Sequence, residues 1–276
     1  MTMGPRTSAS NVLVLCYHAV SERWSAPLSV TPDALRRQLS GLVSRGWMGS
    51  TFTDALSAPH KRTLAVTFDD AFDSVRTLAA PVLADLGLPA TVFVATDWVD
   101  QPLHWPEVAR WAQTVHAGEL RSMSWESLRG LASSGWEIGS HTCTHPHLSR
   151  LDSDVIDAEL RQSRAACLER GVACRSIAYP FGDADERVRA AAAAVGYEAA
   201  AGLSSAAFVA RDRYDWPRVG VWHGEPNWRF ELKVRPLTAR LRGTRLASVA
   251  DVARKQAKSK TLRAQTIGRA RRGNIC

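Results

Sequence analysis

The chain has 276 residues, of which 45% are hydrophobic and 22% charged, a composition typical of a globular protein that excludes a disordered one. Its net charge of +8 is unevenly placed: residues 231–276 hold 13 Lys or Arg against two acids, a balance of +11, which leaves −3 for residues 1–230. We therefore predict one main domain over residues 1–230 and a basic C-terminal tail over 231–276. The main domain itself has no basic surplus for binding nucleic acid.

Cysteine usage and apolar runs bear on the compartment. The five cysteines are an odd number without C-x2-C spacing, which indicates neither a disulfide framework nor a zinc-finger-type site. The first apolar run, Val12–Cys16, is too short for a signal peptide, and no run reaches the length of a membrane span. We expect a cytoplasmic protein.

Short apolar runs alternate with amphipathic stretches through the main domain, which predicts an α/β domain with a parallel sheet. The predicted strands are Val12–Tyr17, Leu64–Phe68, Ala90–Ala95, Trp136–Ser140, Ser176–Tyr179 and Val219–Trp222. The predicted helices are Pro32–Arg45, Ser74–Leu86, Ser124–Ser134, Ser153–Glu169 and Asp185–Val195. The pattern fits an open doubly wound sheet or a barrel, and in both the functional residues lie where strands end.

Two acids, Asp69 and Asp70, end the apolar run Leu-Ala-Val-Thr-Phe. Adjacent carboxylates at the end of a buried strand repel each other unless a cation lies near. The alternative is a turn or helix-capping pair.

Histidines follow another predicted strand in the segment Ser-His-Thr-Cys-Thr-His, where His141 and His145 are four residues apart. Histidines at this spacing converge on one metal ion if the segment turns helically. Pro146 separates His147 from this pair. Two loop histidines without a ligand are the alternative.

A third strand end is found in Arg175-Ser-Ile-Ala-Tyr-Pro-Phe-Gly182. An arginine here would keep a nearby acid ionised, and a Pro-Phe-Gly turn would aim a backbone N–H at a developing oxyanion. The alternative is an ordinary turn built by Pro180 and Gly182.

Taken together and in this order, Thr-Phe-Asp-Asp, Ser-His-Thr-x-x-His and Arg-x-x-x-Tyr-Pro-Phe-Gly resemble the first three motifs of the polysaccharide deacetylases of carbohydrate esterase family 4, the group that includes the nodulation-type chitooligosaccharide deacetylases. The resemblance spans Val12–Trp222. The pair Tyr17-His18 and the segment Trp216-Pro217-Arg218 also look like family features.

The resemblance implies a distorted (β/α) barrel of about seven parallel strands and a role for each matching residue. Asp69 corresponds to the general base, and Asp70, His141 and His145 correspond to the metal ligands. Arg175 matches the arginine that orients the base, and the Phe181 N–H matches the oxyanion donor. The same resemblance gives Tyr179 and Trp216 as substrate contacts, Trp216 in the acetyl pocket.

The chain departs from the family pattern in two places. Ala71 stands where glycine usually follows the paired acids. The late Leu-x-His motif that supplies the general acid has no clear counterpart, so His18 and His223 are both candidates.

These features predict a metal-dependent hydrolase that removes an N-acetyl group from an amino sugar in an oligosaccharide, polysaccharide or lipid-linked glycan. Zinc suits two histidines and a carboxylate, and cobalt, nickel, manganese or iron would also fit. The alternatives are a deacylase of a small N-acyl metabolite and a catalytically silent carbohydrate-binding or membrane-associated relative.

Two further features bear on partners. Tryptophans near predicted loops offer faces for sugar stacking, with core packing as the alternative: Trp98, Trp105, Trp111, Trp125, Trp222 and Trp228. The basic tail predicts peripheral contact with anionic lipid at the inner membrane face, and the alternatives are unspecific nucleic-acid binding and simple solubilisation. No specific nucleic-acid partner is expected.

Overall fold

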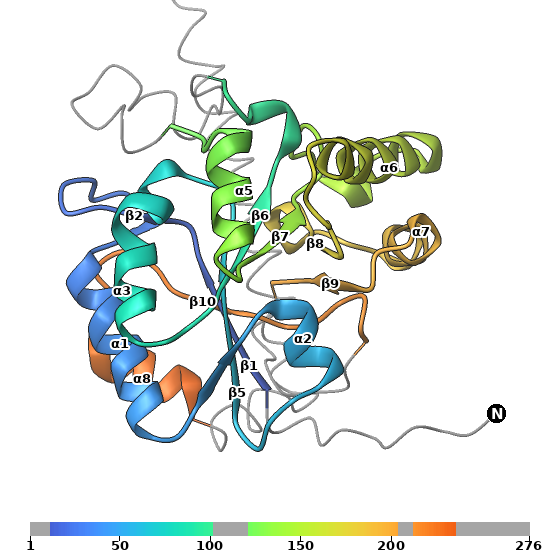
Figure 1. Cartoon of the computed structure of the whole chain (residues 1–276). Coiled ribbons are helices and arrows are strands. Elements are labelled where there is room, and N and C mark those ends of the chain that lie inside the picture. Colours follow the sequence, from blue (N-terminus) through green and yellow to red (C-terminus); the bar gives the residue numbers. More distant parts are fainter. Residues whose placement is uncertain (1–11, 102–120, 204–211, 236–276) are drawn as a thin grey trace, which may run out of the picture.

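In a computed structural model of the chain, residues 12–101, 121–203 and 212–235 are described. A curved sheet has the strand order β10-β1-β5-β6-β7-β8-β9, with β4 also paired to β5, and every pairing is parallel (Figure 1). Its strands are β1 (Val12–Tyr17), β4 (Met48–Ser50), β5 (Thr63–Phe68), β6 (Thr91–Val94), β7 (Glu137–Ser140), β8 (Ser176–Ala178), β9 (Ala199–Ala201) and β10 (Val219–Gly220); β2 (Ala19–Val20) and β3 (Ser29–Val30) form a separate pair. The predicted distorted barrel of parallel strands is confirmed.

Alternation along the buried strands sorts side chains between two apolar clusters. In β1, Leu13 and Leu15 belong to the large cluster shared with the surrounding helices, whereas Val12 and Val14 belong to a small cluster inside the curve of the sheet. Successive side chains of a strand point to opposite faces, so every second residue faces inward. Cys16 and Asp69 continue the inward series from β1 and β5, which brings polar groups to the end of an otherwise apolar interior.

The surrounding helices are α1 (Pro32–Ser44), α2 (Phe52–Ser57), α3 (Ala80–Asp85), α5 (Trp125–Ser133), α6 (Ser153–Glu169), α7 (Glu186–Val195) and α8 (Asn227–Val234). Of these, α1, α5, α6 and α7 begin and end within one residue of the predicted bounds. The Thr31, Ser124 and Asp185 side chains accept N-terminal N–H groups of α1, α5 and α7. Phe52 and Ala55 of α2 pack into the small interior cluster and so close that side of the barrel.

The structure differs from the sequence prediction in several elements, and it contains β2, β3, β4 and α2, which the sequence did not predict. The helix expected over Ser74–Leu86 opens with a π-helical segment, Val75–Ala79, before α3; Pro81 has no N–H to donate, which disfavours a regular helix there. Strand β9 is three alanines and has no β-branched residue to reveal it. Helix α8 runs past the expected boundary at residue 230, with Phe230 and Val234 buried.

Strand ends bring the candidate residues to one edge of the sheet. Asp69 follows β5 and His141 follows β7, and the parallel arrangement places both at the carboxyl edge (Figure 1).

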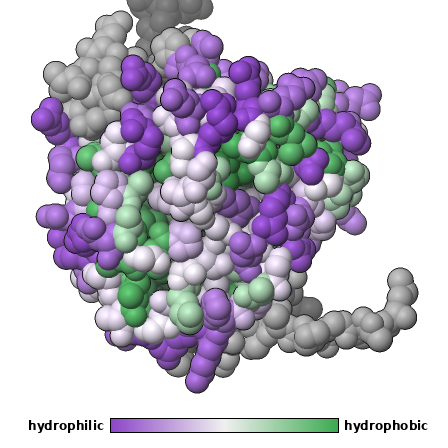
Figure 2. Space-filling model, in the orientation of Figure 1, coloured by the Kyte–Doolittle hydropathy of each residue, from purple (hydrophilic) through white to green (hydrophobic). Residues whose placement is uncertain are grey.

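Hydrophilic residues predominate on the face of the molecule seen in Figure 2. Among the described residues, no helix is long and apolar enough to span a membrane. The described cysteines, Cys16, Cys143, Cys167 and Cys174, are buried and free of disulfides. Cys276 and the predicted tail from residue 236 lie outside the described residues, as do Trp105 and Trp111.

Candidate active site

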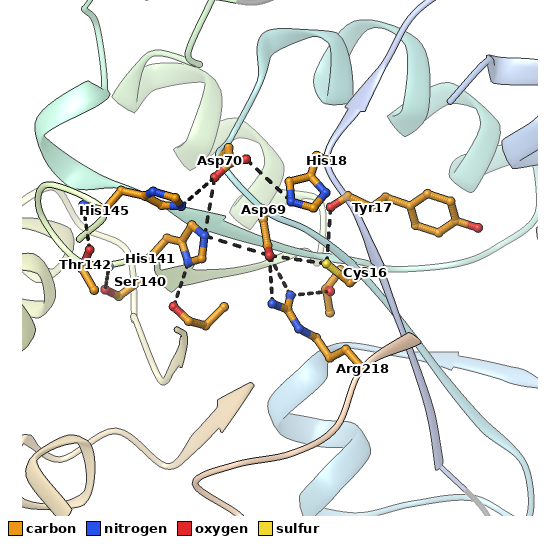
Figure 3. A network of polar contacts seen from close by, with 12 residues as sticks. Cys16, Tyr17, His18, Asp69, Asp70, Ser140, His141, Thr142, His145 and Arg218 are labelled. Atoms are coloured by element: carbon orange, nitrogen blue, oxygen red, sulfur yellow. Dashed lines mark hydrogen bonds and ion pairs between the residues drawn. The ribbon is translucent and has the colours of Figure 1, made fainter. Parts of the chain in front are cut away.

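Asp70, His141 and His145 converge into a three-residue cluster. Asp70 Oδ1 lies 3.5 Å from Nε2 of His141 and 3.5 Å from Nε2 of His145 (Figure 3). One ligand atom from each of the three residues fits within 4.8 Å of the others. A carboxylate and two imidazoles at these separations form a donor set suited to a divalent transition metal, and three protein ligands leave positions open for water and substrate. The residues present therefore fit the metal that the sequence predicts.

The orientation of His141 is set by a backbone carbonyl. Its Nδ1 lies 2.7 Å from the carbonyl oxygen of Ala178 in β8. When Nδ1 carries the proton and donates it to this oxygen, Nε2 has a free lone pair, and this nitrogen is the one that faces Asp70. Burial lowers the pKa of His141, and it lowers the pKa of His145 to about 2, with the neighbouring His141 adding to the effect. Both rings are therefore neutral at physiological pH, the form that binds metals.

The loop that carries the two histidines is held by α6. The Glu159 carboxylate accepts hydrogen bonds from the N–H groups of Cys143 and Thr144, at 2.8 and 3.1 Å, and from the Thr144 hydroxyl at 2.7 Å. Within the loop, the Thr142 hydroxyl accepts from the His145 N–H at 3.0 Å. The sequence reading did not single out Glu159, because nothing local in α6 indicates that its carboxylate reaches the loop.

Asp69 lies beside this cluster and is clamped by a different residue, Arg218. The guanidinium donates two parallel hydrogen bonds, Nη1 to Oδ1 at 2.6 Å and Nη2 to Oδ2 at 2.8 Å (Figure 3). Arg218 is 1% exposed, and it also donates to Thr67 Oγ1 and the Gly202 carbonyl. Burial by itself raises the pKa of Asp69, but the charge and hydrogen bonds of Arg218, together with the nearby His141 and His18, hold that pKa well below its usual range. Asp69 is therefore ionised and fixed in one orientation.

The prediction that Arg175 orients Asp69 is wrong. Arg175 instead pairs with Asp54 at 2.9 Å and with Glu198 at 2.9 and 3.0 Å on the surface. It precedes β8, so in a parallel sheet it lies at the amino edge, opposite the edge where Asp69 emerges. The arginine that performs the predicted contact is Arg218, which directly precedes β10 and lies one residue before the pairing of Val219 with Leu15 near the carboxyl end of β1.

The prediction of Tyr179 as a substrate contact is also wrong. Its side chain is 0% exposed, and its hydroxyl donates to the Tyr214 carbonyl at 2.8 Å. Tyr179 is two residues after Ile177, and both belong to the large cluster on the outer face of the sheet. The period of two along a strand therefore turns this ring away from the site.

The roles that the resemblance implies for Phe181 and Trp216 stay predictions. Phe181 has φ 59°, and its ring is 48% exposed, stacks on His147 at 4.0 Å between centroids and lies 4.7 Å from the His145 ring. Phe181 is thus at the rim of the site, where its N–H is the predicted oxyanion donor. Trp216 is half-buried and packs against the small interior cluster.

Of the two candidates for the general acid, only His18 is in contact with the cluster. His18 Nε2 lies 3.9 Å from Asp70 Oδ2, and its ring lies 5.6 Å from the Trp222 ring. Burial lowers the pKa of His18 to about 4. His223 is exposed, with its Nδ1 3.4 Å from the Ser29 hydroxyl and its N–H on the Pro27 carbonyl.

Left-handed backbone is concentrated at this site. Asp70, Ala71, Thr142, His145 and Phe181 all have φ between 50° and 71°. Such conformations are uncommon for residues other than glycine and cost free energy that the surrounding contacts must offset. At Ala71, φ is 50°, which explains why glycine is usual at this position in the family that the motifs resemble.

Comparisons with known proteins agree with this geometry. Residues 57–200 match the family described as polysaccharide deacetylase. Chitin deacetylase 1 of Cryptococcus neoformans is 30% identical over 145 residues, which are 52% of this chain and 26% of that protein. The chain therefore spans about a quarter of the length of this curated relative. The chain belongs to the polysaccharide deacetylase family.

Solved structures share the fold. The Streptococcus pyogenes deacetylase PplD, in complex with acetate, aligns with a TM-score of 0.67 at 21% identity, over 82% of this chain and 98% of that one. IcaB from Ammonifex degensii aligns with a TM-score of 0.64 at 24% identity, over 83% of this chain and 97% of that one.

Proposed function

We propose that the chain is a metal-dependent hydrolase that removes an N-acetyl group from an amino sugar. The observation that carries this proposal is the convergence of Asp70, His141 and His145 beside an ionised Asp69 held by Arg218. Family membership supports the reaction, since the matching family is named for the deacetylation of polysaccharides.

Asp70, His141 and His145 would hold the ion. When bound, a divalent metal supplies Lewis acidity that acidifies water and polarises an acetamide carbonyl. We propose zinc for this donor set, with cobalt, nickel, manganese and iron as the other ions that it suits.

The protein's own groups would supply the proton transfers. Asp69 would take a proton from the attacking water, because Arg218 fixes its orientation and keeps it deprotonated. The Phe181 N–H would donate to the oxyanion that forms from the carbonyl. We propose His18 as the group that passes a proton to the leaving amine, since it is the acid candidate that contacts the cluster. Burial keeps its resting ring neutral, so the proton that it passes on would be one gained during the reaction.

Aromatic side chains border the site and would stack on sugar rings. The Trp98 ring lies 4.9 Å from the His145 ring, and Trp222 lies beside His18. These two tryptophans and the exposed ring of Phe181 replace the buried Tyr179 as proposed substrate contacts. The name of the Cryptococcus relative, chitin deacetylase 1, suggests N-acetylated oligosaccharides as the first substrates to test.

We also propose that the substrate is reached in the cytoplasm or at the inner face of a membrane, as a soluble or lipid-linked glycan. Four unbonded, buried cysteines suit a reducing compartment. Cell fractionation tests this location, and recovery of the protein outside the cell would contradict it.

The reaction is tested by acetate release from N-acetylglucosamine oligomers and from a lipid-linked N-acetyl sugar, combined with metal analysis. Asp69→Asn should retain metal and lose activity, whereas His141→Ala should lose both. His147→Ala is the matched control, because His147 lies in the same loop and outside the cluster; it should retain metal.

Metal binding without acetate release from any sugar would transfer the proposal to a deacylase of small N-acyl metabolites. Failure of the wild type to bind any divalent metal would favour a catalytically silent carbohydrate-binding or membrane-associated relative.

A further inference from the structure

Helix α8 has an apolar outer face as well as an apolar inner face. Phe230 and Val234 point into the core and are 0% and 3% exposed. Trp228 and Leu232 are four residues apart, so they lie together on the opposite side, and they are 68% and 39% exposed. Trp228 is the most exposed large hydrophobic side chain among the described residues. A surface helix that packs on one side ordinarily presents polar residues on the other.

A small pocket lies at the C-terminal end of α8, between this helix and the end of α1. Its volume is about 190 Å³, with apolar side chains and three arginines in its wall: Leu42, Trp47 and Val234, and Arg45, Arg62 and Arg235, beside Glu231. Arg45 pairs with Glu231 at 2.9 Å, and Arg62 donates to the Arg45 carbonyl. The pocket therefore has two arginines more than it has acids, over an apolar wall. This chemistry suits a phosphate group attached to a hydrocarbon.

The chain beyond α8 is positively charged, as is the arginine-lined wall of the pocket. Residues 235–276 hold 12 Lys or Arg and one acid, a balance of +11. Basic residues next to exposed tryptophan and leucine are typical of protein surfaces that rest on anionic lipid, where the apolar groups enter the headgroup layer and the cations pair with phosphates. A nucleic-acid partner would account for the charge and leave the Trp228 and Leu232 pair unexplained.

We propose that the α8 face, defined as Trp228, Leu232 and the arginine-lined pocket, rests on the surface of an anionic phospholipid bilayer. This inference is independent of the deacetylase reaction and adds a binding surface to it.

The position of α8 determines how the active site would face such a bilayer. The segment leading into the helix carries Trp222, whose ring contacts His18 at the carboxyl edge of the sheet. The far end of α8 lines one pocket together with Trp47 and Arg62, which directly precede β4 and β5 at the amino edge. Helix α8 therefore runs along the side of the barrel. A bilayer against it would lie beside the barrel, with the active site opening along the membrane surface.

The test is co-sedimentation of the full-length protein with vesicles of phosphatidylcholine alone or mixed with phosphatidylglycerol. We expect binding only to the anionic vesicles, weakened by salt. The double variant Trp228→Ala, Leu232→Ala should bind on the order of tenfold more weakly. The matched control is Val155→Ala, Leu168→Ala on α6, whose side chains are 46% and 45% exposed; it should bind as the wild type does.

Three outcomes would overturn the proposal: no binding of the wild type to anionic vesicles, equal binding of the α8 variant and the wild type, or equal loss in the α6 control. Binding to duplex DNA without binding to vesicles would replace the lipid with nucleic acid. Acetate release from a short soluble oligosaccharide should be unchanged in the α8 variant. That assay separates failure of the lipid surface from failure of the deacetylase reaction.

Discussion

Replacing Arg218 by glutamine should damage both stability and catalysis, whereas the same change at Arg175 should do neither. Arg218 is 1% exposed and forms a two-bond pair with a buried carboxylate. Removing one partner of a buried pair leaves the other charge uncompensated, which costs about 3–5 kcal/mol. The side chains of Arg175, Asp54 and Glu198 are 36%, 55% and 45% exposed, and a surface pair of this kind contributes about 0–1 kcal/mol.

The effect on catalysis follows from the pKa of Asp69. Arg218 is the main influence that lowers this pKa against the effect of burial. Without Arg218 the pKa of Asp69 rises, so a proton binds the base at a higher pH than in the wild type. The acid limb of the pH-rate profile should therefore move to higher pH, and kcat/KM at neutral pH should fall by about 10- to 100-fold, as for other residues that support a metal site.

Urea unfolding and acetate release, measured on the wild type, Arg218→Gln and Arg175→Gln, check both effects. Arg218→Lys adds a further comparison, because it keeps the charge and loses the fork of two hydrogen bonds. The reasoning would be refuted if Arg175→Gln lost as much activity as Arg218→Gln, or if Arg218→Gln left both the stability and the pH profile unchanged.

Further predictions concern the loop, the buried imidazoles and the outer face of β8. Glu159→Gln should weaken metal affinity by about tenfold, measured by chelator competition, because its carboxylate positions the histidine loop; unchanged affinity would contradict this role. Metal-free protein should lose stability as the pH falls from 6.5 towards 4, because histidines bind protons at higher pH in the unfolded chain than in the folded one. The lowered pKa of His18 alone corresponds to about 3 kcal/mol of unfolding free energy. An unfolding free energy that stays constant over this pH range would contradict this prediction. Tyr179→Phe should cost about 1 kcal/mol in unfolding through the lost bond to Tyr214 and leave kcat/KM intact, whereas a large loss of activity would restore Tyr179 to the site.

The sequence was sufficient to predict those features that depend on local residue patterns and on the order of strands and motifs along the chain. Strand β1 and helix α6 have the predicted bounds, since apolar periodicity and capping residues are local signals. The pairing of Asp70 with His141 and His145 was also predictable, because motifs that follow parallel strands must meet at the carboxyl edge of the sheet.

Tertiary structure alone decided which supporting residues reach that edge. Arg175 and Arg218 both precede strands, and their sequences do not reveal that β10 pairs near the carboxyl end of β1, which brings Arg218 to Asp69 and leaves Arg175 at the opposite edge. Likewise, the contacts of Glu159 with the histidine loop join groups 15 and 16 residues apart across a helix and a turn. Local propensity is encoded in neighbouring residues, whereas these contacts depend on strand register and on the packing of distant segments, which only the folded chain defines.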